Sequence, residues 1–266
     1  MELLLRRAGR GLGFARLSQY GWARKTFLVV AALLGSAAFA AGANLAGRYA
    51  LWQVVRACLL DKAATGAPLP CLEVDTSDGE ARGWAVLRPP IGAPDTILTP
   101  TRRIAGIEDP LLYAPDVPNY FALAWKARRW LAKADGGAPA DDRVALAVNS
   151  RLARSQDQLH VHIGCLAARF SHSLDEHALG PASAAWFRGP DIGPGLELWT
   201  YRSGAKDWAR LEPFRLARTL VGEEKALARV TLAAAPIHGE IVVFALKSRP
   251  GGWYDSAEDV IDAKCR

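Results

Sequence analysis

SQDQLHVHIGCL, residues 155–166, is the stretch that decides the fold of this 266-residue chain. From residue 158 to residue 166 apolar residues return at every second position, which is the pattern of a β-strand with one buried face. Side chains of a strand point alternately to opposite faces, so this strand has two distinct sides. The polar side holds Gln158, His160 and His162, and the buried side holds Leu159, Val161 and Ile163.

The segments on either side of this strand predict both strands and helices. Strands are expected at 83–87, 96–100, 143–149, 196–202 and 241–247, and helices at 46–60, 120–134, 171–180, 213–220 and 256–263. Around the histidines the order is two strands, a helix and two strands, which favours an antiparallel sheet with packed helices. We therefore expect an α+β fold.

The composition excludes several classes of protein. With 50% hydrophobic and 23% charged residues, the chain is neither disordered, collagen-like nor of low complexity. The net charge of +6 arises in residues 1–48, which hold seven basic residues and one acidic residue. The remainder is neutral, so the sequence argues against a nucleic-acid-binding surface.

The N-terminal region predicts export and a membrane span. FLVVAALLGSAAFAAGA, residues 27–43, carries no charge, and six basic residues precede it. Because basic residues stay on the cytoplasmic side, we expect a cytoplasmic segment at 1–25, a transmembrane anchor at 26–47 and an extracytoplasmic domain at 48–266. Two alternatives remain open: a signal peptide cleaved after Ala40 or Ala43, and a buried helix of a soluble protein.

The four cysteines fit an exported domain. None of them has a CxxC or zinc-ligand spacing, and an even number beyond an export signal indicates two disulfides. Of the three possible connectivities we expect Cys58–Cys71, which closes a short loop, together with Cys165–Cys265, which ties the C-terminus to the central strand. Four buried reduced thiols are the alternative.

The polar row on the histidine strand indicates chemistry at phosphorus. An unprotonated imidazole is a nucleophile near neutral pH, and a second imidazole beside it can donate to a phosphoryl or leaving oxygen. Four candidate phosphate ligands precede the row: Asn149, Arg151, Arg154 and Ser155. Arginine, asparagine and serine side chains all donate to phosphate oxygens, so a phosphate or pyrophosphate is the ligand that unites them.

Two other interpretations of the histidine pair remain open. His-x-His on a strand is also a metal-binding pattern, which would need a third ligand from an acidic residue or from His172, His177 or His238. No third ligand stands at an obvious spacing, and we expect these three histidines at the surface. The pair can also be structural, with no role in chemistry.

Three blocks of sequence carry a resemblance to a known family. Asn149, the polar loop and the apolar-His-apolar-His-apolar run resemble the histidine-triad (HIT-like) superfamily of nucleotide hydrolases and transferases. PTRRIAGIEDPLL (100–112), PNYFALAWKARRWL (118–131) and VNSRLARSQDQLHVHIGCL (148–166), in that order, are similar to the bacterial CDP-diacylglycerol pyrophosphatase family. The resemblance covers most of residues 50–265.

The resemblance implies a role for each matching residue. His160 stands at the position of the nucleophile, and His162 at that of the histidine contacting the phosphate and the leaving oxygen. Asn149 matches the asparagine that contacts the nucleotide or orients the loop. The chain departs from the superfamily pattern at Gln158, which replaces the first histidine; that position orients rather than attacks, so we expect activity to survive.

The resemblance also implies a substrate and a compartment. We expect hydrolysis of CDP-diacylglycerol, a lipid held in the bilayer, to CMP and phosphatidate, without a metal or other cofactor. The chain would be a single-pass protein of the bacterial inner membrane with its catalytic domain in the periplasm, and a monomer. Two alternatives remain: a nucleotidyl transferase or hydrolase acting on soluble nucleotides, and a non-catalytic lipid- or nucleotide-binding protein.

Overall fold

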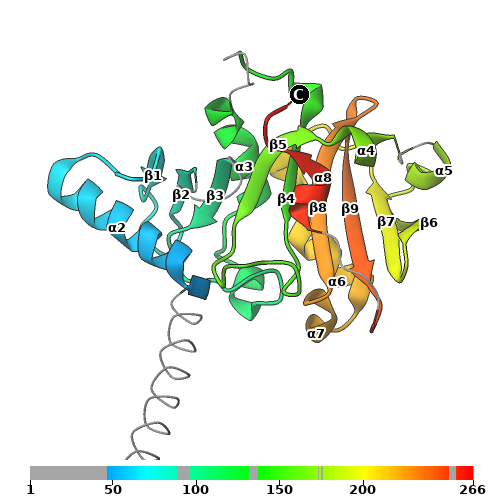
Figure 1. Ribbon diagram of the computed structural model, residues 1–266, viewed down its shortest axis with the longest axis horizontal. Coiled ribbons are helices and arrows are strands. Elements are labelled where there is room, and N and C mark those ends of the chain that lie inside the picture. The colour runs from blue at the N-terminus through cyan, green and yellow to red at the C-terminus, as the bar shows by residue number, and fades with distance from the viewer. Residues whose placement is uncertain are drawn as a thin grey trace, which may run out of the picture. The chain divides into compact units, whose positions relative to one another are not determined.

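The computed structural model describes residues 47–88, 96–131, 137–172, 174, 176–251 and 256–265 (Figure 1). Arg48–Arg266 forms one compact unit. The span expected at 26–47 lies, except for Gly47, outside the described residues. Within those residues, no helix combines the length and the apolar character needed to cross a membrane.

The unit is built on a single antiparallel sheet. Along the sheet the strands follow the order β1-β2-β3-β5-β4-β8-β9-β7-β6, and β10 pairs with β5. Their bounds are β1 Glu73–Asp75, β2 Trp84–Leu87, β3 Thr96–Pro100, β4 Val144–Val148, β5 Val161–Leu166, β6 Trp186–Gly193, β7 Leu196–Arg202, β8 Val230–Ile237, β9 Glu240–Ser248 and β10 Ile261–Asp262. With the helices packed on it, this sheet confirms the predicted α+β class.

The histidine strand β5 lies inside the sheet rather than at its edge. It pairs with β3 on one side and β4 on the other, and His162 stands between Ile97 and Ala147 in register. Because a slip of one residue would turn every side chain to the opposite face, these two ladders fix which way His162 points.

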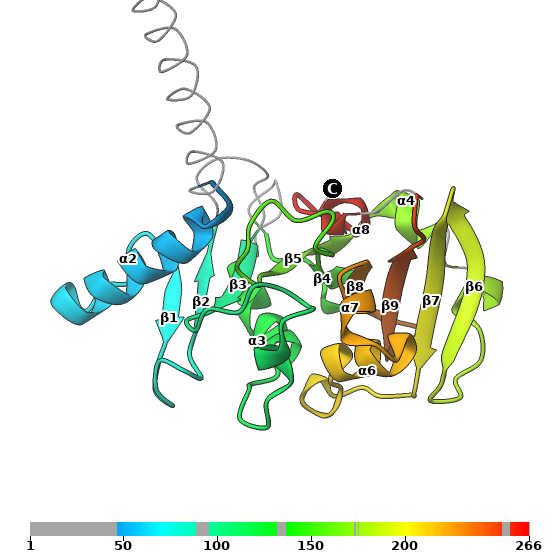
Figure 2. The same ribbon diagram turned by 90° about the horizontal axis from the view of Figure 1, so that it is seen from below.

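Helices cover both faces of the sheet. Figure 2 shows α3 and α6 on one face and α2, α4 and α8 on the other. The bounds are α2 Ala50–Thr65, α3 Tyr120–Ala127, α4 Ala168–Ser171, α5 Glu176–Leu179, α6 Pro213–Val221, α7 Glu224–Leu227 and α8 Ala257–Val260. Short 3-10 turns lie at Pro110–Tyr113 (η1), Arg128–Trp130 (η2), Asp141–Arg143 (η3) and Trp208–Arg210 (η4).

The two faces contain separate apolar cores. Leu159, Val161 and Ile163 belong to the core that also holds Tyr120 and Phe121 of α3, so the predicted buried side of the histidine strand is confirmed. The opposite face holds the core with Val260 and Ile261 near the C-terminus, and the smaller core around Cys58 of α2.

Several predicted elements differ in extent. The strand expected from residue 158 begins at Val161, and the helix expected over 120–134 ends at Ala127 and continues as η2. The helix expected over 256–263 stops at Val260, because Ile261 and Asp262 pair with β5 instead. The helix expected over 171–180 is replaced by the short helices α4 and α5.

Both expected disulfides are present. Cys58 in α2 is joined to Cys71, and Cys165 in β5 to Cys265, with sulfur–sulfur distances of 2.04 and 2.05 Å. The second bond fastens the C-terminal segment beside the histidine strand. Together the two bonds account for all four cysteines of the chain.

Candidate active site

The loop between β4 and β5, residues 149–160, carries most of the candidate residues. Backbone contacts hold both of its ends: Ser150 N–H donates to Thr231 Oγ1 at 3.1 Å, and Leu159 N–H donates to the Ile104 carbonyl at 2.6 Å. Arg151 N–H donates to the Ala228 carbonyl at 3.1 Å. The loop is therefore held in place before His160 enters the sheet.

The ring of His160 is oriented by the backbone two residues earlier. Its Nδ1 lies 2.7 Å from the carbonyl oxygen of Gln158. A carbonyl oxygen only accepts hydrogen bonds, so Nδ1 carries the proton and donates. In the neutral ring the lone pair is then on Nε2, the nitrogen suited to nucleophilic attack.

His162 is the immediate neighbour of His160. The ring centroids lie 4.9 Å apart with the planes tilted by 59°, and Nε2 of His162 lies 3.4 Å from Nδ2 of Asn149. Both histidines are mostly buried, with exposed fractions of 8% and 6%. This proximity places two imidazoles within reach of a single phosphoryl group.

Asn149 is oriented by the C-terminal helix α8. The backbone N–H of Ala257 donates to Asn149 Oδ1 at 2.6 Å. Since a backbone N–H only donates, the oxygen of the carboxamide must face Ala257 and its NH2 group must face His162. The segment closed by the Cys165–Cys265 bond thus reaches the site at Asn149.

Gln158 is fully buried and turned toward β3. Its Nε2 donates to the carbonyls of Pro100 at 3.0 Å and Arg102 at 3.1 Å, and Oε1 has no hydrogen-bond partner within the described part of the chain. The side chain therefore joins the end of β3 to the backbone whose carbonyl orients His160. The expected role of Gln158 in orienting the site stays a prediction.

Arg154 lies in a buried network of ion pairs. Its guanidinium contacts Glu108 at 2.7 Å and Asp157 at 2.9 Å, and only 4% of its side chain is exposed. Asp157 also binds Arg48 through two contacts of 2.7 Å. Hydrogen bonding by Arg48, and then by Arg154, lowers the pKa of Asp157 to about 2. The sequence alone did not indicate Glu108 and Asp157 as partners of Arg154. The expected contact of Arg154 with the diphosphate stays a prediction.

The remaining candidates lie at the surface. Arg151 and Ser155 are exposed on the same loop as His160, and their binding roles also stay predictions. His172, His177 and His238 are exposed, as expected. Across the described ranges, no three His, Cys, Asp or Glu side chains form a group able to hold a metal ion.

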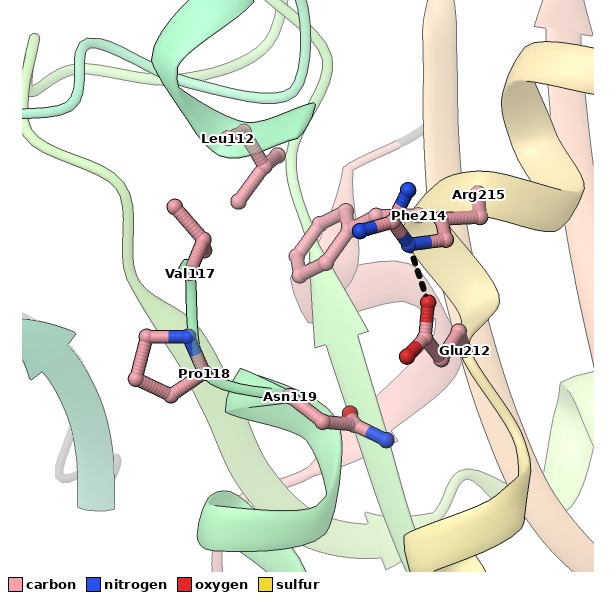
Figure 3. A pocket seen from close by; sticks show the side chains of 7 residues that line it. All are labelled: Leu112, Val117, Pro118, Asn119, Glu212, Phe214 and Arg215. Atoms are coloured by element: carbon pink, nitrogen blue, oxygen red, sulfur yellow. Dashed lines mark ion pairs between the residues drawn. The ribbon is translucent and has the colours of Figure 1, made fainter. Parts of the chain in front are cut away.

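Two hollows differ sharply in their chemistry. One is lined by Gly106, Val148, Asn149, Arg154, Gln158, Leu159 and His160, so it brings four of the predicted site residues together. The other, on the face covered by α3 and α6, is shown in Figure 3. There Glu212 pairs with Arg215, while Asn119 caps α3 and donates to the Leu211 carbonyl at 2.7 Å. Of these two hollows, the first is lined by an imidazole and the second is not.

The fold and this hollow together define an α+β enzyme with a pair of adjacent imidazoles. The family model described as CDP-diacylglycerol pyrophosphatase matches residues 46–266. A CDP-diacylglycerol pyrophosphatase from Yersinia pestis is 35% identical over 203 residues, which cover 75% of this chain and 76% of that protein. The chain belongs to the CDP-diacylglycerol pyrophosphatase family. This confirms the resemblance and the hydrolase class predicted from the sequence.

Proposed function

We propose that this chain hydrolyses the pyrophosphate bond of CDP-diacylglycerol, releasing CMP and phosphatidate, with His160 as the nucleophile. Membership of the family and the likeness to the Yersinia pestis protein support the substrate. The hydrogen bond from His160 Nδ1 to the Gln158 carbonyl carries the assignment of the nucleophile, because it leaves the lone pair on Nε2.

In the first step Nε2 of His160 attacks the phosphorus on the cytidine side. The bond from that phosphorus to the bridging oxygen breaks, and phosphatidate leaves with the bonding electron pair. The ring becomes a positively charged cytidylyl-imidazolium. The Gln158 carbonyl at Nδ1 stabilises that charge, which is absent from the free enzyme, so the contact strengthens as the reaction proceeds.

In the second step water attacks the same phosphorus and His160 departs from it. The water loses one proton to the solvent, the phosphorus–nitrogen bond breaks, and CMP is released with the neutral imidazole restored. Splitting one difficult displacement into two lowers the barrier of each. No metal ion or other cofactor takes part in either step.

His162 and Asn149 stabilise charge around the phosphorus. His162 donates to a phosphoryl oxygen or to the leaving phosphatidate oxygen, and its ring lies 4.9 Å from that of His160. The NH2 group of Asn149 faces the same space, since Ala257 fixes its oxygen. Arg151 and Ser155, exposed on the same loop, and Arg154, which lines the hollow with His160, complete the proposed binding residues for the diphosphate.

We place the enzyme in the histidine-triad superfamily and at the outer face of the bacterial inner membrane. The antiparallel sheet, with His162 on its interior strand β5 and His160 directly before that strand, supports the first assignment. The charge pattern of residues 1–47 supports a retained anchor, and two disulfides fit an oxidising compartment.

Hydrolysis in water enriched in oxygen-18 tests this function. Purified full-length protein is incubated with CDP-diacylglycerol, and both products are examined by mass spectrometry. Attack at the cytidine-side phosphorus puts the heavy oxygen into CMP and none into phosphatidate. Label in phosphatidate, transfer of CMP to another acceptor in place of water, or binding of the lipid without turnover would each contradict the proposal.

A further inference from the structure

The loop that carries His160 is fastened to the first residues of the compact unit. Arg48 binds both carboxylate oxygens of Asp157, and the Arg48 carbonyl accepts the Asp157 N–H at 2.7 Å. Next to this, Leu51 N–H donates to Gln156 Oε1 at 2.9 Å. Figure 1 shows the start of α2 at the same end of β4 and β5 as the loop between them.

A second loop is joined to the first through a buried ion pair. Arg154 contacts Asp157 on its own loop and Glu108 on the loop that precedes η1. Arg103, in that second loop, stacks over the ring of Tyr49 with its guanidinium carbon 4.7 Å from the ring centroid. Both loops are therefore fixed to the residues at 48–51.

One exposed leucine lies on the first loop, and another lies in η1 directly after the second loop. Leu152, beside the exposed Arg151, is 43% exposed, and Leu111 in η1 is 42% exposed. Single exposed leucines are ordinary. These two, however, lie on or directly after loops joined by Arg154 and fixed beside Arg48, and the other large exposed apolar side chains of the described residues, Leu60 and Leu69, lie in the later part of α2 and in the loop after it.

We propose that Leu111, Arg151 and Leu152 form a bilayer-contacting surface of this enzyme. The proposal rests on the proposed function, because it takes the substrate to be a bilayer lipid. The apolar run expected to span the membrane ends at residue 47, one residue before Arg48. In the proposed anchor Arg48 therefore follows the last residue of the span directly, and Arg48 is bound to the loop that carries Leu152.

The charge and the apolar character of this surface both suit contact with a lipid bilayer. Leu111 and Leu152 would enter the boundary between headgroups and acyl chains, where burial of their side chains is favourable. Arg151 would lie among the phosphates of anionic lipids. The diphosphate of the substrate would then reach His160 while its acyl chains stay in the membrane.

Comparing a bilayer substrate with a water-soluble substrate distinguishes a loss of membrane contact from a loss of catalysis. Full-length protein is reconstituted in phosphatidylcholine–phosphatidylglycerol vesicles and assayed with CDP-dioleoylglycerol in the bilayer and with water-soluble CDP-dibutyrylglycerol. Leu152→Asp and Leu111→Asp should each lower turnover of the bilayer substrate about tenfold, and leave turnover of the soluble substrate within about twofold. Leu69→Asp, at a leucine that is 66% exposed and lies away from the two loops, should change neither rate.

A direct probe of position completes the test. All four native cysteines are in disulfides, so a Leu152→Cys protein takes one environment-sensitive fluorophore, and Leu69→Cys is the matched control. We expect blue-shifted emission at position 152 only. Equal emission at both positions, unchanged rates in the aspartate variants, or equal losses on both substrates would overturn the docking surface. If the wild type hydrolyses neither substrate, the proposed function fails, and the fluorophore still decides whether position 152 contacts the bilayer.

Discussion

The backbone N–H of Ala257 donates a hydrogen bond of 2.6 Å to Oδ1 of Asn149, although 108 residues separate them in the sequence. This bond decides which way the carboxamide points, and so directs its NH2 group to His162. The C-terminal segment is thereby a part of the site, although it carries none of the catalytic or substrate-binding residues predicted from the sequence.

Replacing Asn149 should separate the two functions of its carboxamide. Asn149→Ala leaves the buried N–H of Ala257 without an acceptor, which should cost about 1–3 kcal/mol of stability. Asn149→Asp keeps the acceptor and removes the donor facing His162. We expect near-native thermal stability and a fall in kcat of about tenfold or more for Asn149→Asp. Equal kcat in Asn149→Asp and the wild type would show that the NH2 group takes no part in turnover.

The two disulfides should differ in their effect on activity. Removing Cys165–Cys265 by double serine substitution opens a loop of sequence separation 100 and frees the segment that holds Asn149. We expect a loss of up to about 4 kcal/mol, together with a lower kcat in the protein that remains folded.

Removing Cys58–Cys71, of sequence separation 13, is the matched control. It should lower stability by up to about 3 kcal/mol and leave kcat unchanged. Thermal unfolding and steady-state kinetics on both double variants measure the difference. Equal falls in kcat would mean that the C-terminal segment does not position the site.

The lowered pKa of Asp157 predicts that the folded protein becomes less stable in acid. Its folded pKa of about 2 lies below the ordinary value of 3.8. The ionised carboxylate therefore stabilises the fold at pH values above about 4, and this contribution is lost as the pH falls from about 4 toward 2. From the size of the shift the contribution is about 2 kcal/mol at neutral pH.

Denaturant unfolding of Asp157→Asn measures that contribution. The variant should be about 2 kcal/mol less stable than the wild type at pH 7, with the gap closing below pH 4. Asp207→Asn removes a carboxylate that lies 3.6 Å from Arg210 at the surface and should change stability by less than about 0.5 kcal/mol. A gap for Asp157→Asn that persists unchanged at pH 3 would contradict the ionic account.

Local patterns predicted the parts of the fold that depend on neighbouring residues. The alternation at 158–166 identified the buried side of β5 and the adjacent pair His160 and His162. The strand expected at 96–100 has the observed bounds of β3. Strands β6 and β8 were missed, because β6 contains glycine and proline and β8 contains three alanines, residues that are uncommon in strands.

The rest of the site depends on contacts between distant segments. From its position in a polar loop, Arg154 would be expected in solvent. In the structure it is bound to Glu108, which lies 46 positions earlier in the sequence. Gln158 binds the carbonyls of Pro100 and Arg102 at the end of β3, which lie more than 50 positions earlier in the sequence. No spacing in the sequence predicts that α8 reaches Asn149; the antiparallel pairing of β10 with β5 and the Cys165–Cys265 bond bring it there.

The most direct test of the account is the covalent state of His160 during turnover. Full-length protein mixed with CDP-diacylglycerol is quenched within one turnover in alkaline denaturant, where a phosphorus–nitrogen bond survives, and its peptides are analysed by mass spectrometry. The account predicts cytidylate on the peptide at His160, present also in His172→Ala and absent from His160→Ala, which should be inactive. Full turnover by His160→Ala, or cytidylate on a different residue, would contradict it.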